Sequence, residues 1–303
     1  MPLVECVPNF SEGRRQEIID QILEAIKKAG KITLLDSRMD PDHNRAVVTF
    51  IGEPNECLKA AFAGCKKASE LIDMNEHEGE HNRFGSTDVI PFIPVSDITL
   101  EECAELAKKL GEKIAKELKI PIYLYGDAAI NPNREILQNY RTKSFQYEQL
   151  KEEIETNDDY IPDFGERKIH PTAGGTNVGA RNFLIAYNIY LNTDDMEIAK
   201  AIARNIRFSG GGLRYIQAGA MNIEERGVVQ VSMNVTNYLG TPLHRVFDMV
   251  KREAERYGVA VTESEIYGML PLDALLDAAE NYLQLNNFDR KQIIEKRIFS
   301  KGE

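Results

Sequence analysis

Two kinds of sequence pattern alternate along this chain, and they occur in the same order in its two halves. Runs in which apolar residues alternate or follow one another predict β-strands, and runs with apolar residues three and four positions apart predict α-helices. In each half the predicted order begins strand, helix, strand, strand, helix, strand. This order is typical of a layer in which helices pack on one face of a sheet. The repeat is one of pattern rather than of sequence identity.

The first half follows this order and then adds one more helix and one more strand. Its first helix carries Ile18, Ile19, Ile22, Leu23 and Ile26 on one face, which predicts that this face is buried. The predicted elements are strands at 3–10, 32–37, 46–52, 89–95 and 121–126 and helices at 14–29, 55–74 and 100–118.

A polar stretch at 130–161, with a short helical run at 145–155, interrupts the alternation. We interpret it as a long excursion, and we expect a linker between the halves near 166–180. The second half then resumes the order with strands at 183–191, 213–223, 228–235 and 259–268 and helices at 194–206, 242–257, 272–283 and 289–298. The sequence therefore predicts an α/β (α+β) chain with domains at 1–178 and 179–303. Each domain is expected to be a ferredoxin-like βαββαβ subdomain with its helices on one face of its sheet.

Composition narrows the class of protein. A chain of 303 residues suits two modest domains or one large one, and it is long enough to bury a sizeable core. Its net charge of −11 argues against a nucleic-acid-binding protein, because such a protein needs a basic face. Small anionic substrates stay possible, since they respond to local rather than net charge.

The cysteines and the N-terminus indicate a cytoplasmic protein. No CxxC pair or regular framework relates the four cysteines, so we expect reduced thiols. These are Cys6, Cys57, Cys65 and Cys103. Polar Asn9 and Ser11 come too early for a signal peptide. No apolar stretch approaches the roughly 20 residues that span a bilayer, so no membrane association is expected.

Two of the five histidines, His77 and His81, are spaced so that they permit two different chemistries. They match the HExxH signature of zinc proteases, in which a helix places both imidazoles on one face. The helical pattern before them stops at Met74, and Gly79 between them would cost a helix roughly 1 kcal/mol. The zinc interpretation is therefore disfavoured, and no metal is expected.

In the other interpretation a loop presents the histidines. An imidazole with an unperturbed pKa of about 6.5 exchanges a proton near neutral pH. Neighbouring carboxylates are expected to raise the pKa of His81 or to fix its tautomer, and Arg83 would add a cation for an anionic ligand. These carboxylates belong to Glu76, Glu78, Glu80 and Asp88. On this reasoning alone, both histidines could equally be solvated.

The segment EHNRFGSTDVIPFIPV at 80–95 resembles the signature of the glutamate formiminotransferase family, the folate-dependent enzymes of histidine breakdown. Five other segments resemble further blocks of this family, in the same order. The others are VECVPNFSEGR (4–14), NRAVVTFIG (44–52), PIYLYGDAA (121–129), PDFG (162–165) and GARNFLIAYNIYL (179–191). Together with the more diverged second half, the resemblance covers nearly the whole chain.

The resemblance implies transfer of a formimino group from N-formimino-L-glutamate to N5 of tetrahydrofolate, with His81 as general acid/base. It also implies a substrate cleft between the two subdomains and a homodimer. His77 falls outside this assignment. Asn82 stands where vertebrate members tend to have Pro, and Ser86-Thr87 stand where they tend to have Ala-Leu. We expect these differences to affect which amino-acid donor is accepted.

The resemblance also assigns folate binding to a glycine-containing loop. The matching residues are Gly165, Glu166, Arg167, Lys168, Ile169, His170, Pro171, Thr172, Ala173 and Gly174. This loop is more basic here than in other members, and a flexible linker is the alternative interpretation. Glycine would let the backbone approach the ligand closely.

Four residues are candidates for contacting substrate: Asn9, Arg45, Arg83 and Arg214. A guanidinium can hold a carboxylate through two parallel hydrogen bonds. A turn at Asn9 and a surface ion pair at Arg45 stay open as alternatives. The glycine run at 209–212 follows a helix instead of preceding one, so it predicts a helix exit and not a phosphate cradle.

Other functions stay open beside the transferase. The chain would then be a related folate enzyme acting on 5-formyltetrahydrofolate or another formimino donor, a non-catalytic folate-binding protein or, more distantly, a zinc hydrolase. The sequence ends at Glu303 without the cyclodeaminase domain of vertebrate enzymes. We therefore expect a separate protein to deaminate the product.

Overall fold

The computed structural model describes residues 1–142 and 145–299. The chain separates into two compact units, Met1–Asn182 and Phe183–Glu303. Within the described residues, no helix has both the length and the apolar character that a membrane span requires. Each unit has its own sheet, and the mixed α/β class predicted from the sequence is confirmed.

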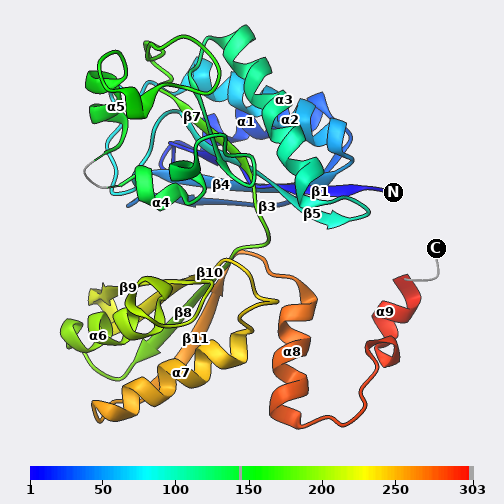
Figure 1. Ribbon diagram of the computed structural model, residues 1–303, viewed down its shortest axis with the longest axis vertical. Coiled ribbons are helices and arrows are strands. Elements are labelled where there is room, and N and C mark those ends of the chain that lie inside the picture. Colours follow the sequence, from blue (N-terminus) through cyan, green and yellow to red (C-terminus); the bar gives the residue numbers. More distant parts are fainter. Residues whose placement is uncertain (143–144, 300–303) are drawn as a thin grey trace. The chain divides into compact units, whose positions relative to one another are not determined.

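A seven-stranded sheet forms the centre of the first unit (Figure 1). Its strands are β1 (Leu3–Cys6), β2 (Asn9–Phe10), β3 (Ile32–Asp40), β4 (Arg45–Gly52), β5 (Thr87–Ser96), β6 (Ile122–Gly126) and β7 (Thr176–Ala180). β1 and β2 both lie between β4 and β5, and β3 lies outside β4. These neighbours are antiparallel, whereas β7 is parallel to both β5 and β6. The βαββαβ arrangement is therefore extended by two strands.

Three helices cover one face of this sheet: α1 (Gln16–Ala29), α2 (Pro54–Leu71) and α3 (Leu100–Leu118) (Figure 1). The apolar face predicted for α1 is buried at Ile18, Ile19, Ile22 and Ile26, and Leu23 packs against the same core. The capping box predicted at Thr99 and Glu102 begins α3. Because the helices occupy one face, polar side chains of the central strands gather on the other.

The prediction of a linker near 166–180 is wrong for residues 176–180. Residues Thr176–Ala180 form β7, which is fully buried between β5 and β6. A short run containing glycine and asparagine, TNVGA, carries little strand propensity. Its position inside the sheet, where both neighbours supply hydrogen bonds, overrides that weak local preference.

The polar excursion is a folded part of the first unit. It contains α4 (Leu137–Tyr140), α5 (Tyr147–Glu153) and short 3₁₀ turns at Pro132–Arg134 and Asp158–Tyr160. Figure 1 shows α4 and α5 at the end of the unit away from α1 and α2. The apolar side chains of the excursion form a small second core with strand β6 and with the histidine segment, the loop at 72–86 that carries His77 and His81. This core contains Phe84, Tyr123, Phe145, Leu150 and Ile154.

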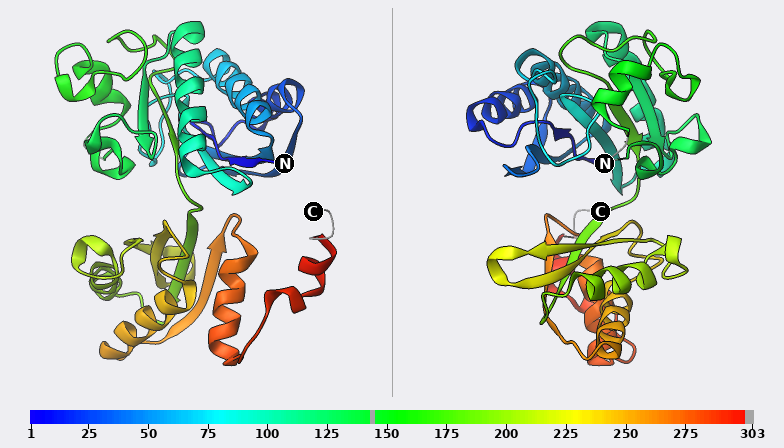
Figure 2. Two further views of the ribbon diagram at one scale, coloured as in Figure 1. Left: turned by 45° about the vertical axis from the view of Figure 1, so that its right-hand side comes forward. Right: turned by 90° about the vertical axis from the view of Figure 1, so that its left-hand side faces the viewer.

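The second unit has a four-stranded antiparallel sheet in the order β11-β8-β10-β9. The strands are β8 (Ile185–Leu191), β9 (Ile216–Ile223), β10 (Val228–Val235) and β11 (Val261–Tyr267). Helices α6 (Met196–Ile206) and α7 (Leu243–Arg256) pack together against it (Figure 2), and their apolar residues share one core with the strands. This is the predicted βαββαβ order, followed by α8 (Leu272–Leu283) and α9 (Ile294–Phe299).

Candidate active site

The segment that carries His77 and His81 is a loop. α2 ends at Leu71 and β5 begins at Thr87, and no helix forms between them. The helix that a zinc-protease motif requires is therefore missing from this segment. Within residues 1–142 and 145–299, no group of three His, Cys, Asp or Glu side chains is placed to hold a metal ion.

His77 holds this loop in place. Its Nδ1 accepts a hydrogen bond from Nε of Arg83 at 3.2 Å, so Nε2 carries the proton and donates to the carbonyl oxygen of Asn44 at 3.0 Å. Burial lowers the pKa of His77, which keeps the ring neutral. The interpretation of His77 as a solvated residue is therefore wrong.

Arg83 connects the same loop to the excursion. Its guanidinium is buried and bonds both carboxylate oxygens of Glu148 on α5, at 2.9 and 2.7 Å. It also donates to the carbonyl oxygen of His77 at 3.1 Å. Arg83 was predicted to contact an anionic ligand, but its guanidinium is already used by these internal contacts. In this structure Arg83 serves to position the loop.

His81 lies between an arginine and an aspartate. Its Nε2 accepts a hydrogen bond from Nη1 of Arg45 at 2.7 Å. Arginine can only donate, so Nε2 is unprotonated and Nδ1 carries the proton of the neutral ring. Nδ1 lies 3.9 Å from the Oδ2 atom of Asp88. The aspartate therefore favours the tautomer that leaves Nε2 as a proton acceptor.

The electrostatic surroundings of His81 differ from the prediction. Burial, followed by the charge of Arg45 and then that of Arg141, lowers the pKa of His81 to about 2. The predicted rise is wrong because Glu76, Glu78 and Glu80 are exposed to solvent instead of facing the ring. Asp88 does face it, but a neighbouring arginine offsets its charge.

That arginine is Arg141, which the excursion supplies to the site. It pairs with the buried carboxylate of Asp88 and donates to the carbonyl oxygen of Asn82 at 2.6 Å. Asp88 also accepts the backbone N–H of Phe84 at 3.0 Å. Burial raises the pKa of Asp88, and Arg141 is the largest opposing influence. Sequence reasoning missed Arg141, since nothing in this polar stretch distinguishes it from Arg134.

Two predicted substrate residues lie on the sheet face opposite the helices. Asn9 on β2 is directly opposite Val47 on β4. Arg45 is two positions from Val47 and therefore projects from the same face. Arg45 is in contact with His81, whereas Asn9 donates to the carbonyl oxygen of Val7 at 3.0 Å.

The other predicted residues lie elsewhere. Arg214 belongs to the second unit, where its guanidinium lies 5.2 Å from the ring centroid of Tyr215. The glycine run at 209–212 follows α6, which ends at Ile206, and Gly211 has φ 87°. The helix exit predicted there is confirmed.

The loop predicted to bind folate is joined to the histidine loop at one end. Gly174 forms an antiparallel bridge with Gly85, and Nδ1 of His170 accepts the backbone N–H of Ala173 at 2.9 Å. At its other end, the loop and the last turns of α3 line a hollow of about 540 Å³, whose charged residues are Lys116, Lys119, Lys168, Glu112 and Glu166. The loop thus borders both the histidine segment and a hollow in which lysines outnumber glutamates.

Replacing Gly85 with alanine should disturb this junction. An added Cβ would lie 2.2 Å from the carbonyl oxygen of Ala173 and 2.3 Å from that of Gly175. Because backbone atoms must move, we expect a loss of about 1–3 kcal/mol in unfolding free energy, measured by urea denaturation. Gly219→Ala is the control, since its Cβ meets nothing within 4 Å. Equal stability of the two variants would contradict the close approach.

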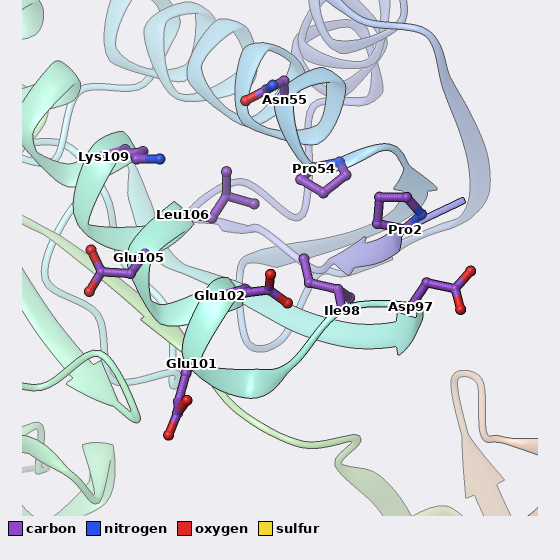
Figure 3. A pocket seen from close by; sticks show the side chains of 10 residues that line it. All are labelled: Pro2, Pro54, Asn55, Asp97, Ile98, Glu101, Glu102, Glu105, Leu106 and Lys109. Atoms are coloured by element: carbon purple, nitrogen blue, oxygen red, sulfur yellow. The ribbon is translucent and has the colours of Figure 1, made fainter.

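A separate hollow of about 420 Å³ lies between the starts of α2 and α3 (Figure 3). Its lining contains the carboxylates of Asp97, Glu101, Glu102 and Glu105 and the ammonium of Lys109. None of the predicted site residues contributes to it. Its acidic lining suits an anionic substrate poorly, so we place the candidate site at His81.

The lowered pKa of His81 has a consequence for stability. An unfolded histidine has a pKa of about 6.5, so below that pH the unfolded chain binds a proton that the folded protein resists. Stability should therefore fall as the pH falls from 6.5, with roughly 1–2 kcal/mol lost by pH 5 through His81.

Urea denaturation at several pH values measures this loss. The His81→Asn variant should show a smaller loss than the wild-type protein. The same pH dependence in His81→Asn and wild type would contradict a neutral, buried His81.

Comparison with known proteins places this chain in a family. Residues 3–181 match the formiminotransferase domain, N-terminal subdomain, and residues 186–299 match the formiminotransferase domain. The chain belongs to the formiminotransferase family. It is 50% identical over 298 residues to the glutamate formimidoyltransferase of Thermoplasma acidophilum, covering 98% of both chains. The glutamate formimidoyltransferase of Streptococcus pyogenes is 48% identical, again with 98% of both chains covered.

A mouse relative shows the same domain within a longer protein. The formimidoyltransferase-cyclodeaminase of Mus musculus is 44% identical over 286 residues, which cover 92% of this chain and 52% of the mouse protein. The match to the family confirms the resemblance drawn from the six sequence segments.

Proposed function

We propose that this protein is a glutamate formimidoyltransferase that moves the formimino group of N-formimino-L-glutamate to N5 of tetrahydrofolate. The products are L-glutamate and 5-formiminotetrahydrofolate. One observation carries the proposal. His81 is held as a neutral imidazole, with Asp88 facing Nδ1 and a proton-accepting Nε2, in a chain about half identical to two named glutamate formimidoyltransferases.

The reaction needs one proton acceptor that also serves as a donor. N5 attacks the carbon of the protonated formimino group, and a tetrahedral adduct forms. Nε2 of His81 takes the proton from N5 and delivers it to the α-amino nitrogen of glutamate. The bond between carbon and that nitrogen then breaks, and the carbon–nitrogen double bond re-forms on the group now attached to N5. Such general acid–base catalysis typically contributes about 10²–10⁴-fold.

Asp88 is the positioning residue in this account. Its buried carboxylate faces Nδ1, and it favours the imidazolium that exists after the first proton transfer. Arg141 and the N–H of Phe84 hold the carboxylate in place. A histidine oriented in this way returns its proton from a defined direction.

Tetrahydrofolate is the proposed co-substrate, and residues Gly165–Gly174 are its proposed binding loop. Folate carries carboxylates on its glutamate tail, and Lys116, Lys119 and Lys168 beside this loop offer positive charge. The loop also reaches the histidine segment through the Gly174–Gly85 bridge. The homodimer and the cytoplasmic location stay predictions.

A donor comparison tests this function. Purified protein and tetrahydrofolate are incubated with N-formimino-L-glutamate in one reaction and with formiminoglycine in a second. In a third reaction the protein is incubated with 5-formyltetrahydrofolate and L-glutamate, without tetrahydrofolate. We expect 5-formiminotetrahydrofolate from N-formimino-L-glutamate at a rate well above that of formiminoglycine. Turnover of the formyl compound alone would replace the proposal with a formyltransferase. Folate binding without turnover of any donor would leave a binding protein.

A further inference from the structure

In the free protein, the hydrogen bond from Arg45 blocks the atom of His81 that must accept the proton during catalysis. A neutral imidazole has one acceptor nitrogen, and in His81 that nitrogen receives Nη1 of Arg45 at 2.7 Å. A general base must come within hydrogen-bond distance of the proton that it removes. The guanidinium therefore occupies the place that the proton on N5 must reach.

We propose that a carboxylate of the amino-acid donor takes Arg45 from His81 and thereby switches the histidine into its basic state. This inference rests on the proposed function and adds its regulation by substrate. The donor class is an α-amino dicarboxylate. A guanidinium bonds a carboxylate through charge-assisted pairs, which are roughly twice as strong as bonds to neutral acceptors. A carboxylate of the donor would therefore compete with the neutral imidazole for Arg45.

The charges around His81 support a switch at this bond. Arg45 faces the ring from β4, Asp88 from β5 and Arg141 from the segment after α4. His43, whose ring centroid lies 6.4 Å from that of His81, and Arg83 complete the set. Arg141 and Arg83 are each bonded to a carboxylate, on Asp88 and Glu148.

Of these cations, Arg45 is the one in direct contact with His81, and its charge lowers the pKa of His81 more than the charge of any other neighbour. Arg45 also lies within electrostatic reach of Asp40, whose pKa it helps to lower. A substrate carboxylate that meets Arg45 would both uncover Nε2 and cancel the nearest positive charge. Both effects make His81 a stronger base only when the donor is bound.

The test is an NMR titration of protein labelled with ¹⁵N in its histidine rings, from pH 8 to pH 5, with and without saturating L-glutamate. His81→Asn identifies the resonance of His81 among the five histidines. In the free protein we expect His81 to stay neutral down to pH 5. With L-glutamate its midpoint should rise above pH 5, a change of more than one pH unit and more than tenfold in proton affinity, so that protonation becomes visible within the titrated range. Sodium chloride at the same ionic strength should leave the midpoint unchanged.

Arg45→Gln tests the arginine itself. This variant should raise the midpoint of His81 above pH 5 without ligand, and L-glutamate should no longer move it. Arg256→Gln, which removes an exposed arginine from α7, should behave as the wild type. The proposal is overturned if L-glutamate leaves the wild-type midpoint unchanged, or if Arg45→Gln keeps the wild-type response. The wild-type titration stands on its own if Arg45→Gln fails to fold.

Failure of the switch and failure of the proposed function give different results. L-Glutamate is bound here without turnover, so the titration does not depend on formimino transfer. A protein that transfers the group while its His81 midpoint ignores L-glutamate would keep the function and lose the switch. A protein whose His81 midpoint responds to L-glutamate but which transfers no formimino group would keep the switch and lose the proposed function.

Discussion

Replacing His81 with alanine should lower kcat for formimino transfer by about 10²–10⁴-fold and leave the fold intact. The expectation follows from the absence of a second imidazole in the same position. His77 is occupied by Arg83 and Asn44, and Nδ1 of His43 lies 2.8 Å from Oδ2 of Asp40. Steady-state rates with N-formimino-L-glutamate and tetrahydrofolate measure the loss.

Two comparisons separate chemistry from structure in this experiment. His244→Ala removes a histidine of the second unit and should retain wild-type turnover. Added imidazole should restore part of the activity of His81→Ala, because it can enter the vacated space and accept the proton. Full turnover by His81→Ala, or a large loss in unfolding free energy, would remove His81 from its proposed role.

Replacing Arg134 with alanine should destabilise the first unit by about 3–5 kcal/mol. The guanidinium is buried and pairs with the buried carboxylate of Asp163 at 2.9 Å. It also donates to the carbonyl oxygens of Asp159 at 2.9 Å and Ile161 at 2.8 Å. Its removal leaves a buried charge and two carbonyl groups without this partner. Urea denaturation measures the change, and turnover should fall as well because the same excursion holds Arg141.

A double-mutant cycle is the control for Arg134. Asp163→Ala leaves the guanidinium uncompensated, whereas the double variant removes both charges. The double variant should therefore be less destabilised than the sum of the two single variants, by more than about 1 kcal/mol. Simple additivity, or a loss below about 1 kcal/mol for Arg134→Ala, would show that the pair does not anchor the excursion.

The fold was predictable where local pattern and tertiary environment agree. The isoleucines of α1 repeat at helical spacing and are buried as predicted, and β10 occupies the predicted residues 228–235. The strand β7 was not predictable, because Thr176–Ala180 has weak strand propensity and owes its conformation to β5 and β6. The aromatic residues of 130–161 were hidden in the same way by their polar neighbours.

The candidate site was predictable at His81 and Arg45 but not in its electrostatics. Family resemblance marks the histidine, and the ability of a guanidinium to hold a carboxylate marks Arg45 as a candidate without saying what it contacts. The direction of the pKa shift of His81 depends on burial and on Arg141, which lies 60 positions away in sequence. Neighbouring glutamates in sequence suggested the opposite shift. Only the folded chain shows that they face solvent.

The most direct test of the account follows one carbon atom. N-Formimino-L-glutamate labelled with ¹³C in its formimino carbon is mixed with tetrahydrofolate and an equimolar amount of protein, and the label is observed by NMR. We predict that the resonance moves from the donor to a carbon attached to N5 of the folate, with one equivalent of L-glutamate released. A label that stays on the donor, or leaves it as formamide or formate without reaching folate, would contradict formimino transfer.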